Sequence, residues 1–401
     1  MTDQNTTTMA KWMLPDGIEE TLPAQASVLE QLRRRLLDHF SCCGYDLVMT
    51  PFVEYLDVLL AGSGKELDIQ TFKVTDALSG RQMGLRADMT LQAARIDAHQ
   101  IQQDSPVRLC YLATVLRTFK SGFAGSRTPL QIGAELYGHA GLESDFEILE
   151  LMLDTLRLAG VVDVHIDLGH VGIFRGLMEQ AGLDSSQEQA LFDALQRKAI
   201  PELGALVESM SLDKDMSRWL LVLADLNGGP ETLRRAQQEL SGASDKVQNA
   251  LEDMMQISDS ILERHPGLSV HYDLAELRGY AYQTGLVFAA FVPGYGEEIA
   301  RGGRYDDIGR IFGRARPATG FSADLKLLIQ LSSLLPSHAN GGIFAPAVKD
   351  DGLCEAVHEL REQGERVIYA LPGQQGDASD VGCDRQLCQK DGKWQIVTAN
   401  K

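Results

Sequence analysis

The sequence predicts an α+β fold, in which a largely antiparallel sheet is flanked by helices and carries a helical insertion and a small C-terminal α/β unit. Apolar and polar residues alternate with a period of two in several segments between residues 70 and 170, which is typical of strands with one face on a core. Residues 171–266 show helical spacing, and strand patterns resume after Pro266-Gly267. We therefore expect a disordered tail at 1–10, a core at 11–182 and 267–332, an insertion at 183–266 and a small domain at 340–401.

The first predicted helix covers residues 26–43. Ser27 and Glu30 have the spacing of a capping box, apolar residues follow at helical intervals, and Gly44 is a suitable end. Residues 45–54 are predicted to be extended. Pro51 lies within them and cannot donate a hydrogen bond to a ladder, which suits a sheet edge or an interface.

The core strands are predicted from alternation and from β-branched and aromatic residues. Short connections between neighbouring strands favour antiparallel pairing, with a helix over residues 144–158 packed on the sheet. The predicted strands are 81–90, 108–119, 130–137 and 161–169, with further strands between 269 and 299.

The insertion and the C-terminal unit have their own signals. Ser185 and Glu188 repeat the capping spacing at the start of the helical region. In the C-terminal unit, a strand, a helix and a second strand precede two strands joined at Asp391-Gly392, a dipeptide typical of a tight hairpin turn.

Composition excludes several classes of protein. The 401 residues include 37 basic and 56 acidic side chains, and a net charge of −19 argues against a general nucleic-acid binder. Mean hydropathy is −0.12 and no long apolar run occurs, so no membrane span is expected. Six scattered cysteines without zinc-like spacing fit reduced thiols in the cytoplasm, and no metal or cofactor motif is present.

The strand at 130–137 carries the first candidate site. Gln131, Gly133, Glu135 and Tyr137 share one face because side chains of equal parity point the same way, while the other face is entirely apolar. A glycine between Gln131 and Glu135 leaves space that a small ligand can occupy.

Further polar side chains repeat this pattern in two other predicted strands. Together with the first set they supply two carboxylates, three guanidinium groups, an amide and hydroxyls, which match the ammonium and carboxylate of a free amino acid. The alternative is a half-solvated antiparallel sheet, since spacing alone does not make these strands neighbours. The added residues are Arg86, Asp88 and Thr90, then Arg278, Tyr280, Tyr282 and Thr284, and Arg117 at a strand end.

These motifs, in this order, resemble the class II histidyl-tRNA synthetases over about residues 12–330. Residues 86–90, 116–117 and 131–135 are similar to the amino-acid site and motif 2 of that family, and 277–282 resemble its histidine signature, RGLDYY. The stretches 301–306 and 320–325 are similar to the approach to motif 3, and 45–51 to motif 1 at the dimer interface.

The resemblance implies a histidine pocket. In the family pattern Glu135 would receive the imidazole, Tyr282 would line the pocket, and Gln283 stands where the family has a ring-contacting tyrosine. The remaining contacts would hold the ligand's α-ammonium through Asp88, Thr90 and Gln131, and its α-carboxylate through Arg117 and Arg278.

Departures from the family pattern fall on the groups that handle ATP and tRNA. Phe119 replaces a motif 2 glutamate, Leu130 replaces a histidine, and Leu327 replaces the motif 3 arginine that stacks on adenine. Since phosphoryl chemistry depends on electrostatic positioning, adenylate formation is predicted to be lost. The 62 residues from 340 to 401 carry 7 basic and 10 acidic side chains, a poor composition for binding tRNA.

A chain with this combination resembles the regulatory subunits of ATP phosphoribosyltransferase. The resemblance implies a cytoplasmic, non-catalytic homodimer within a hetero-oligomer, with the short-form ATP phosphoribosyltransferase catalytic subunit as its partner and no tRNA. It implies activation of that subunit and feedback inhibition by histidine in histidine biosynthesis. The alternatives are a histidyl-tRNA synthetase or related adenylate-forming enzyme, and a structural dimer with a vestigial pocket.

Overall fold

The computed structural model describes residues 12–61, 65–120, 125–276, 280, 282–332 and 341–399. The chain divides into a first compact unit, Met1–Leu334, and a second, Leu335–Lys401. In the described part of the chain, no helix combines the length and apolar character needed to cross a membrane.

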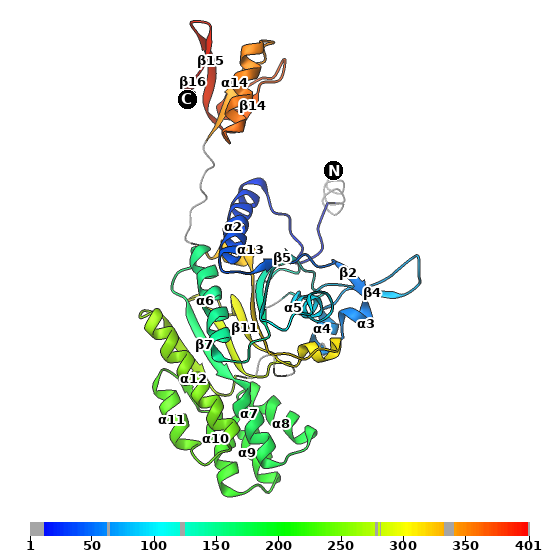
Figure 1. Ribbon diagram of the computed structural model, residues 1–401, viewed down its shortest axis with the longest axis vertical. Helices are drawn as coiled ribbons and strands as arrows, with labels where there is room; N and C mark the ends of the chain where they lie inside the picture. The colour runs from blue at the N-terminus through cyan, green and yellow to red at the C-terminus, as the bar shows by residue number, and fades with distance from the viewer. Residues whose placement is uncertain are drawn as a thin grey trace, which may run out of the picture. The chain divides into compact units, whose positions relative to one another are not determined.

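Nine described strands form the main sheet of the first unit (Figure 1). Neighbours pair antiparallel except β1 with β5 and β7 with β9, which are parallel. The sheet is therefore largely antiparallel, as predicted. In spatial order its strands are β1 Asp46–Leu47, β5 Val107–Thr114, β6 Leu130–Tyr137, β12 Ala318–Asp324, β11 Ala300–Arg304, β10 Leu286–Phe291, β7 His165–His170, β9 Ser269–Asp273 and β8 Asn227–Gly228.

The apolar face of this sheet holds the main core. Ile132, Ala134 and Leu136 of β6 are fully buried there, under helices α2 (Pro23–Cys42) and α6 (Leu142–Leu158). Helix α13 (Leu325–Gln330) follows β12 and packs on α2. The other face of β6 is left for polar side chains.

Helix α2 begins earlier than predicted. Pro23 occupies its first turn, where the missing N–H costs nothing, and Leu22 caps it without a side-chain bond. Ser27 therefore lies inside the helix and accepts a hydrogen bond from Gln31 Nε2 at 3.3 Å, so the predicted capping box of Ser27 and Glu30 is wrong.

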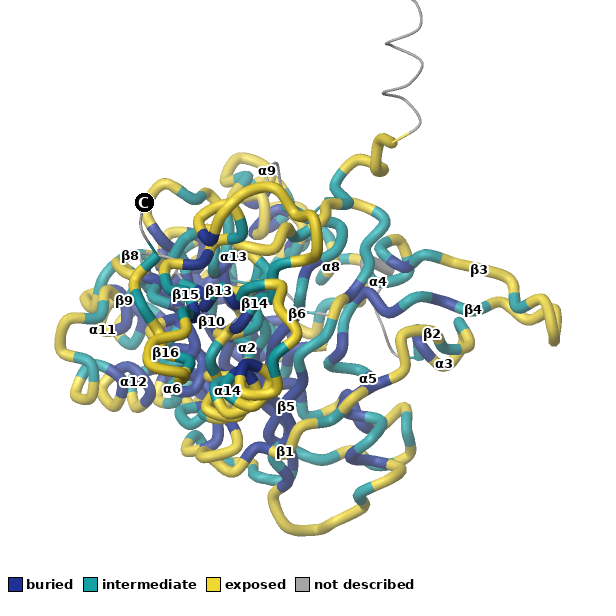
Figure 2. The backbone as a smooth tube through the Cα atoms, turned by 90° about the horizontal axis from the view of Figure 1, so that it is seen from above, coloured by how far each residue is buried: buried dark blue, intermediate teal, exposed yellow. Residues whose placement is uncertain are grey.

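The predicted strand at 81–90 ends at Leu85. It is β4 (Gln82–Leu85), the middle strand of a small sheet between β2 (Val53–Tyr55) and β3 (Lys73–Thr75). Asp88 Oδ1 accepts the Thr90 N–H at 2.8 Å and Thr90 begins helix α5 (Thr90–Ile96), so Arg86, Asp88 and Thr90 do not share a strand face. Figure 2 shows the β3–β4 hairpin extending away with an exposed tip.

Two of the other predicted core strands are shorter in the structure, whereas the strand at 130–137 has its predicted bounds. The strand expected at 108–119 ends at Thr114, before Arg117. The strand expected at 161–169 begins only at His165, since Asp163 has φ 55° and Val162 is exposed. Short helical segments complete this region: α3 Leu56–Leu59, α4 Lys65–Gln70, a π-helical turn Asp97–Ile101 and a 3₁₀ turn Ile308–Phe312.

Between β7 and β9 the chain is mainly helical. Helix α8 is capped by Asp184 with Gln187 in a reciprocal capping box, one residue earlier than predicted, which leaves the Glu188 side chain available for another contact. The helices are α7 Val171–Ala181, α8 Ser185–Gln196, α9 Ile200–Ser209, α10 Lys214–Leu223, α11 Glu231–Glu239 and α12 Asp245–Arg264.

The second unit is a small sheet with one main helix, α14 (Asp351–Glu362). Its predicted hairpin is confirmed: β15 and β16 pair antiparallel around Asp391 (φ 49°) and Gly392 (φ 76°), the positive φ values that a type I′ turn requires. Its strands, in spatial order, are β14 Val367–Tyr369, β13 Gly342–Ala345, β15 Cys383–Lys390 and β16 Lys393–Thr398, and a short 3₁₀ turn covers Ser379–Val381.

Candidate functional site

Glu135 lies at the centre of the polar face, on β6 between β5 and β12. The side chain is 1% exposed and accepts hydrogen bonds from the hydroxyls of Tyr111, at 2.9 Å, and Tyr305. Burial raises the pKa of Glu135 to about 8, although both hydroxyl donors oppose the rise. The carboxyl is therefore largely protonated at neutral pH.

The sheet register makes room for this carboxyl. Gly320 of β12 pairs with Glu135, and a Cβ on that glycine would collide with Glu135 Oε2. Only a residue without a side chain lets the carboxyl lie across the neighbouring strand.

The space beside Gly133 is not left open, contrary to the sequence prediction. Tyr111 of β5 pairs with Gly133, and a Cβ at that position would lie 2.6 Å from the Tyr111 hydroxyl. The glycine admits the tyrosine side chain that bonds Glu135. A ligand that reaches Glu135 must therefore share this space with Tyr111 or displace it.

Three other predicted residues form a cluster joined to Glu135. Gln131 Nε2 donates to Asp88 Oδ2 at 2.8 Å, and Gln131 Oε1 accepts the Met89 N–H at 3.1 Å. Thr90 Oγ1 lies 3.3 Å from the Tyr111 hydroxyl, which also contacts Glu135. The structure thus brings Asp88, Thr90, Gln131 and Glu135 together.

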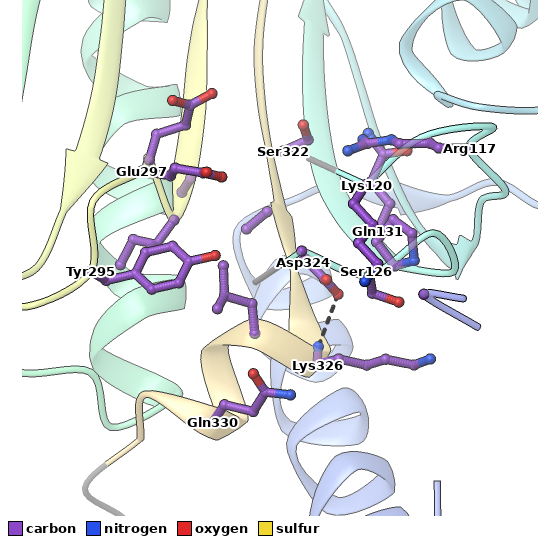
Figure 3. Close-up of a pocket in the computed structure, with 18 of the residues that line it drawn as sticks. Arg117, Lys120, Ser126, Gln131, Tyr295, Glu297, Ser322, Asp324, Lys326 and Gln330 are labelled. Carbon is purple, nitrogen blue, oxygen red and sulfur yellow. Dashed lines mark hydrogen bonds between the residues drawn. The ribbon is translucent and has the colours of Figure 1, made fainter. Parts of the chain in front are cut away.

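Arg117 follows β5 and lines a pocket of about 430 Å³ that Gln131 also lines. Its Nε donates to the Ala87 carbonyl at 3.3 Å, which places the guanidinium next to the segment that carries Asp88. Figure 3 shows Arg117, Lys120 and Gln131 on one side of the pocket and Tyr295 and Glu297 on the other.

The same pocket contains charges of both signs. Arg117, Lys120 and Lys326 line it together with Glu297 and Asp324. Asp324 accepts the N–H groups of Leu130 and Lys326, both at 3.0 Å, and burial raises its pKa. Leu327, at the position of the family's motif 3 arginine, is also part of the wall.

The histidine-signature segment, 277–282, precedes β10, and the structure describes its residues Tyr280 and Tyr282. Arg278 lies outside the described residues, and Tyr280, Tyr282 and Thr284 do not form the predicted strand face. Strand geometry begins only at Leu286, because the Thr284 N–H bonds the Arg304 carbonyl at 2.7 Å and its Oγ1 accepts the Asp306 N–H at 3.0 Å.

Gln283 and Tyr282 occupy different environments before β10. Gln283 is 6% exposed, and its Oε1 has no hydrogen-bond partner among the described residues; a Cβ on Gly303 would lie 2.8 Å from that atom. A buried amide oxygen without a partner is costly and is therefore a candidate ligand contact. Tyr282, in contrast, is 41% exposed.

Sequence reasoning missed the roles of three residues around the site. Tyr111 and Tyr305 hold Glu135, and Arg304 is buried in a network with Asp145, at 2.9 Å, and Ser144, at 2.8 Å. For Tyr111 the available signal was its place inside a largely apolar predicted strand, because a buried tyrosine hydroxyl usually has a partner. Arg86, which was predicted to share the ligand face, instead bonds the Thr50 and Thr114 carbonyls.

Comparisons with known proteins agree over the whole chain. Residues 17–328 match the histidyl-tRNA synthetase family, and residues 340–397 match the ATP phosphoribosyltransferase subunit HisZ C-terminal domain. An ATP phosphoribosyltransferase regulatory subunit of Thioalkalivibrio sulfidiphilus is 54% identical over 98% of both chains. One of Methylococcus capsulatus is 56% identical over 96% of both.

Solved structures show the same architecture. A protein of Bacillus halodurans C, described as an ATP phosphoribosyltransferase regulatory subunit/histidyl-tRNA synthetase, superposes with a TM-score of 0.78 at 26% identity, covering 92% of this chain and 95% of its own. A histidyl-tRNA synthetase of Nostoc sp. PCC 7120 reaches a TM-score of 0.76 at 18% identity, covering 96% and 97%, and shares the fold.

Proposed function

Because the chain belongs to the ATP phosphoribosyltransferase regulatory subunits, we propose that its synthetase-like pocket binds free histidine and reports histidine to the short-form catalytic subunit. The chain has a regulatory role in histidine biosynthesis and is not itself the phosphoribosyltransferase catalyst.

The buried carboxyl of Glu135 is the observation that carries the proposal. An imidazole N–H needs an acceptor, and Glu135 is a buried acceptor held by two tyrosine hydroxyls. Gln283 would supply a second acceptor for the ring, an amide oxygen that has no partner among the described residues. Tyr282 is proposed to line the pocket beside the ring. A protonated Glu135 can instead donate to the unprotonated ring nitrogen, so either form of the carboxyl can meet the imidazole.

The amino-acid end of histidine is proposed to lie toward Asp88. Asp88, Thr90 and Gln131 offer oxygen acceptors to the α-ammonium, and they are already joined by hydrogen bonds. Arg117, beside Ala87, is proposed to receive the α-carboxylate together with Arg278. Binding histidine would replace part of the internal cluster with bonds to the ligand.

Adenylate formation is proposed to be absent. Leu327 lines the pocket without a charge, and Phe119, which replaces a motif 2 glutamate, is 62% exposed. Leu130 contributes its main-chain N–H to Asp324 and no imidazole. An apolar side chain has no guanidinium group, so it can neither stack on adenine as arginine does nor pair with phosphate.

We also propose a homodimer that assembles with the catalytic subunit into a hetero-oligomer and does not bind tRNA. Strand β1 lies at the end of the main sheet, and Leu47, Met49 and Phe52 beside it are exposed. Exposed apolar side chains gathered at a sheet end are typical of a subunit interface. The structural-dimer alternative would keep this interface and lack histidine binding.

Calorimetry with histidine tests the pocket. Wild-type protein is expected to bind, Glu135→Ala to lose binding, and Glu362→Ala, at an exposed position of α14, to bind as wild type. Equal binding by wild type and Glu135→Ala would remove the pocket assignment. Regulation is tested by adding the chain to the short catalytic subunit: phosphoribosyl transfer should rise with the chain and fall with histidine, and histidine-dependent ATP–pyrophosphate exchange would instead reveal a synthetase.

A further inference from the structure

We propose that Tyr280 is a positioning residue that fastens the pocket loop to the helical insertion, so that helix α8 responds to histidine occupancy. This inference rests on the proposed histidine pocket and adds the element that changes with the ligand. It assigns a role to the insertion, whose helices contribute no residue to the proposed ligand contacts.

The ring of Tyr280 is held between helices α7 and α8. Phe174 of α7 meets it edge-on with ring centroids 5.4 Å apart, and Phe192 of α8 lies at 5.2 Å. Arg175 of α7 places its guanidinium 4.8 Å from the ring centroid and donates to the Tyr280 carbonyl at 2.7 Å. Helices α7 and α8 thus both hold the side chain of Tyr280, and α7 also holds its backbone.

The hydroxyl of Tyr280 makes a separate bond to α8. It donates to Glu188 Oε1, and Glu188 lies one helical turn before Phe192, so both side chains reach Tyr280 from one face of the helix. Because Asp184 and Gln187 cap α8, Glu188 is not used as a capping residue. The bond to Tyr280 is therefore a specific use of this carboxylate.

The other end of the loop is fixed to the centre of the pocket. Three residues after Tyr280 is the buried Gln283, and Thr284 bonds Arg304 and Asp306. Tyr305, between those two, donates to Glu135. Tyr280 is held by α8 and lies only four residues before Thr284, which bonds both chain neighbours of Tyr305. Because the two contacts are so close in sequence, a displacement at one of them can pass to the other.

Two further contacts tie α7 and the insertion to the same region. The Val171 N–H, at the start of α7, bonds the Gly285 carbonyl at 3.1 Å, immediately after the loop. Lys198, in the connection between α8 and α9, pairs with Asp273 at 2.9 Å, at the end of β9. Helix α7 and the insertion therefore hold the two flanks of the segment that carries Gln283.

Amide hydrogen exchange combined with calorimetry tests the link in the full-length chain. In wild type, histidine is expected to slow exchange in residues 185–196 by about threefold or more, because the ligand orders the loop that α8 holds. Tyr280→Phe, which keeps the ring and loses the hydroxyl, is expected to remove most of that protection and to weaken histidine binding about five- to tenfold. Glu188→Leu should do the same, and the double variant should be no weaker than either single one, because both remove one bond.

The matched control is Tyr272→Phe, which also deletes a buried tyrosine hydroxyl, bonded to Ser258, without touching the loop. It should keep histidine affinity and α8 protection. Wild-type affinity and protection in Tyr280→Phe, alongside lost binding in Glu135→Ala, would overturn this inference and leave the pocket intact. No histidine binding by wild type would overturn the pocket, and the link with it.

Discussion

Replacing Glu135 by glutamine should flatten the pH dependence of stability. In the folded chain burial raises the pKa of Glu135 from 4.5 to about 8, so the carboxyl must give up its proton in a buried site as the pH rises. A raised pKa contributes stability that is fully present below pH 4.5 and is lost as the pH rises through 8. Glutamine has nearly the same shape and does not titrate.

The size of the effect follows from the two pKa values. Each pKa unit corresponds to about 1.4 kcal/mol, and integrating between pH 5.5 and 8.5 gives a loss of roughly 3 kcal/mol for wild type that Glu135→Gln lacks. Urea unfolding followed by circular dichroism gives the free energy of unfolding at each pH. The effect is the difference between the two proteins in how that free energy changes with pH.

A second carboxylate provides the control. Hydrogen bonds from Arg108 and Tyr45 lower the pKa of Glu147 in spite of its burial, so its contribution is lost only as the pH falls through the acid range. Glu147→Gln should change the free energy of unfolding, but above pH 5.5 it should not change how that free energy varies with pH. Parallel stability curves for wild type and Glu135→Gln from pH 5.5 to 8.5 would refute the assignment of Glu135 as a buried, mostly protonated carboxyl.

Three further changes have expected outcomes. Gly320→Ala should destabilise the fold by about 1–3 kcal/mol in thermal unfolding and abolish histidine binding, because its Cβ would lie 2.8 Å from the Ala134 carbonyl and displace Glu135; unchanged histidine affinity would contradict this. Arg304→Leu should cost about 3–5 kcal/mol in urea unfolding by leaving buried Asp145 without its cation, and a loss below 1 kcal/mol would be inconsistent with that pairing. Met49→Asp should shift the proposed dimer toward monomer in sedimentation, whereas an unchanged mass would place the interface elsewhere.

The sequence predicted correctly those helices, strands and turns whose ends are determined by residues close to them in the chain. The strand at 130–137 has its predicted bounds, because alternation over eight residues matches one pleated face. The Asp391-Gly392 hairpin follows from the positive φ that its turn requires. The Ser27 and Glu30 pattern failed because Pro23 starts the helix one turn earlier, and a proline at that position competes directly with a later cap.

The site was predictable only in part, because its geometry depends on pairing between distant strands. The sequence indicated Glu135 and Gln131, and the family resemblance grouped them with Asp88 and Thr90. That Tyr111 fills the space at Gly133 depends on the register of β5 against β6, which sequence spacing does not determine. Tyr280 was expected on a strand face, but its partners lie about 90 to 105 residues away in α8 and α7.

The order of the strands has a consequence for synthesis. Strand β6 lies between β5, its near neighbour in sequence, and β12, which begins at Ala318. While the chain emerges from the ribosome, one edge of β6 lacks its partner until the insertion and β9 to β12 have been made. Chains that stop before Ala318 would carry Glu135 on an open sheet edge and should be prone to aggregation or degradation. The position of β12 thus makes the completion of the ligand pocket a late step in folding, so that only a nearly complete first unit can respond to histidine.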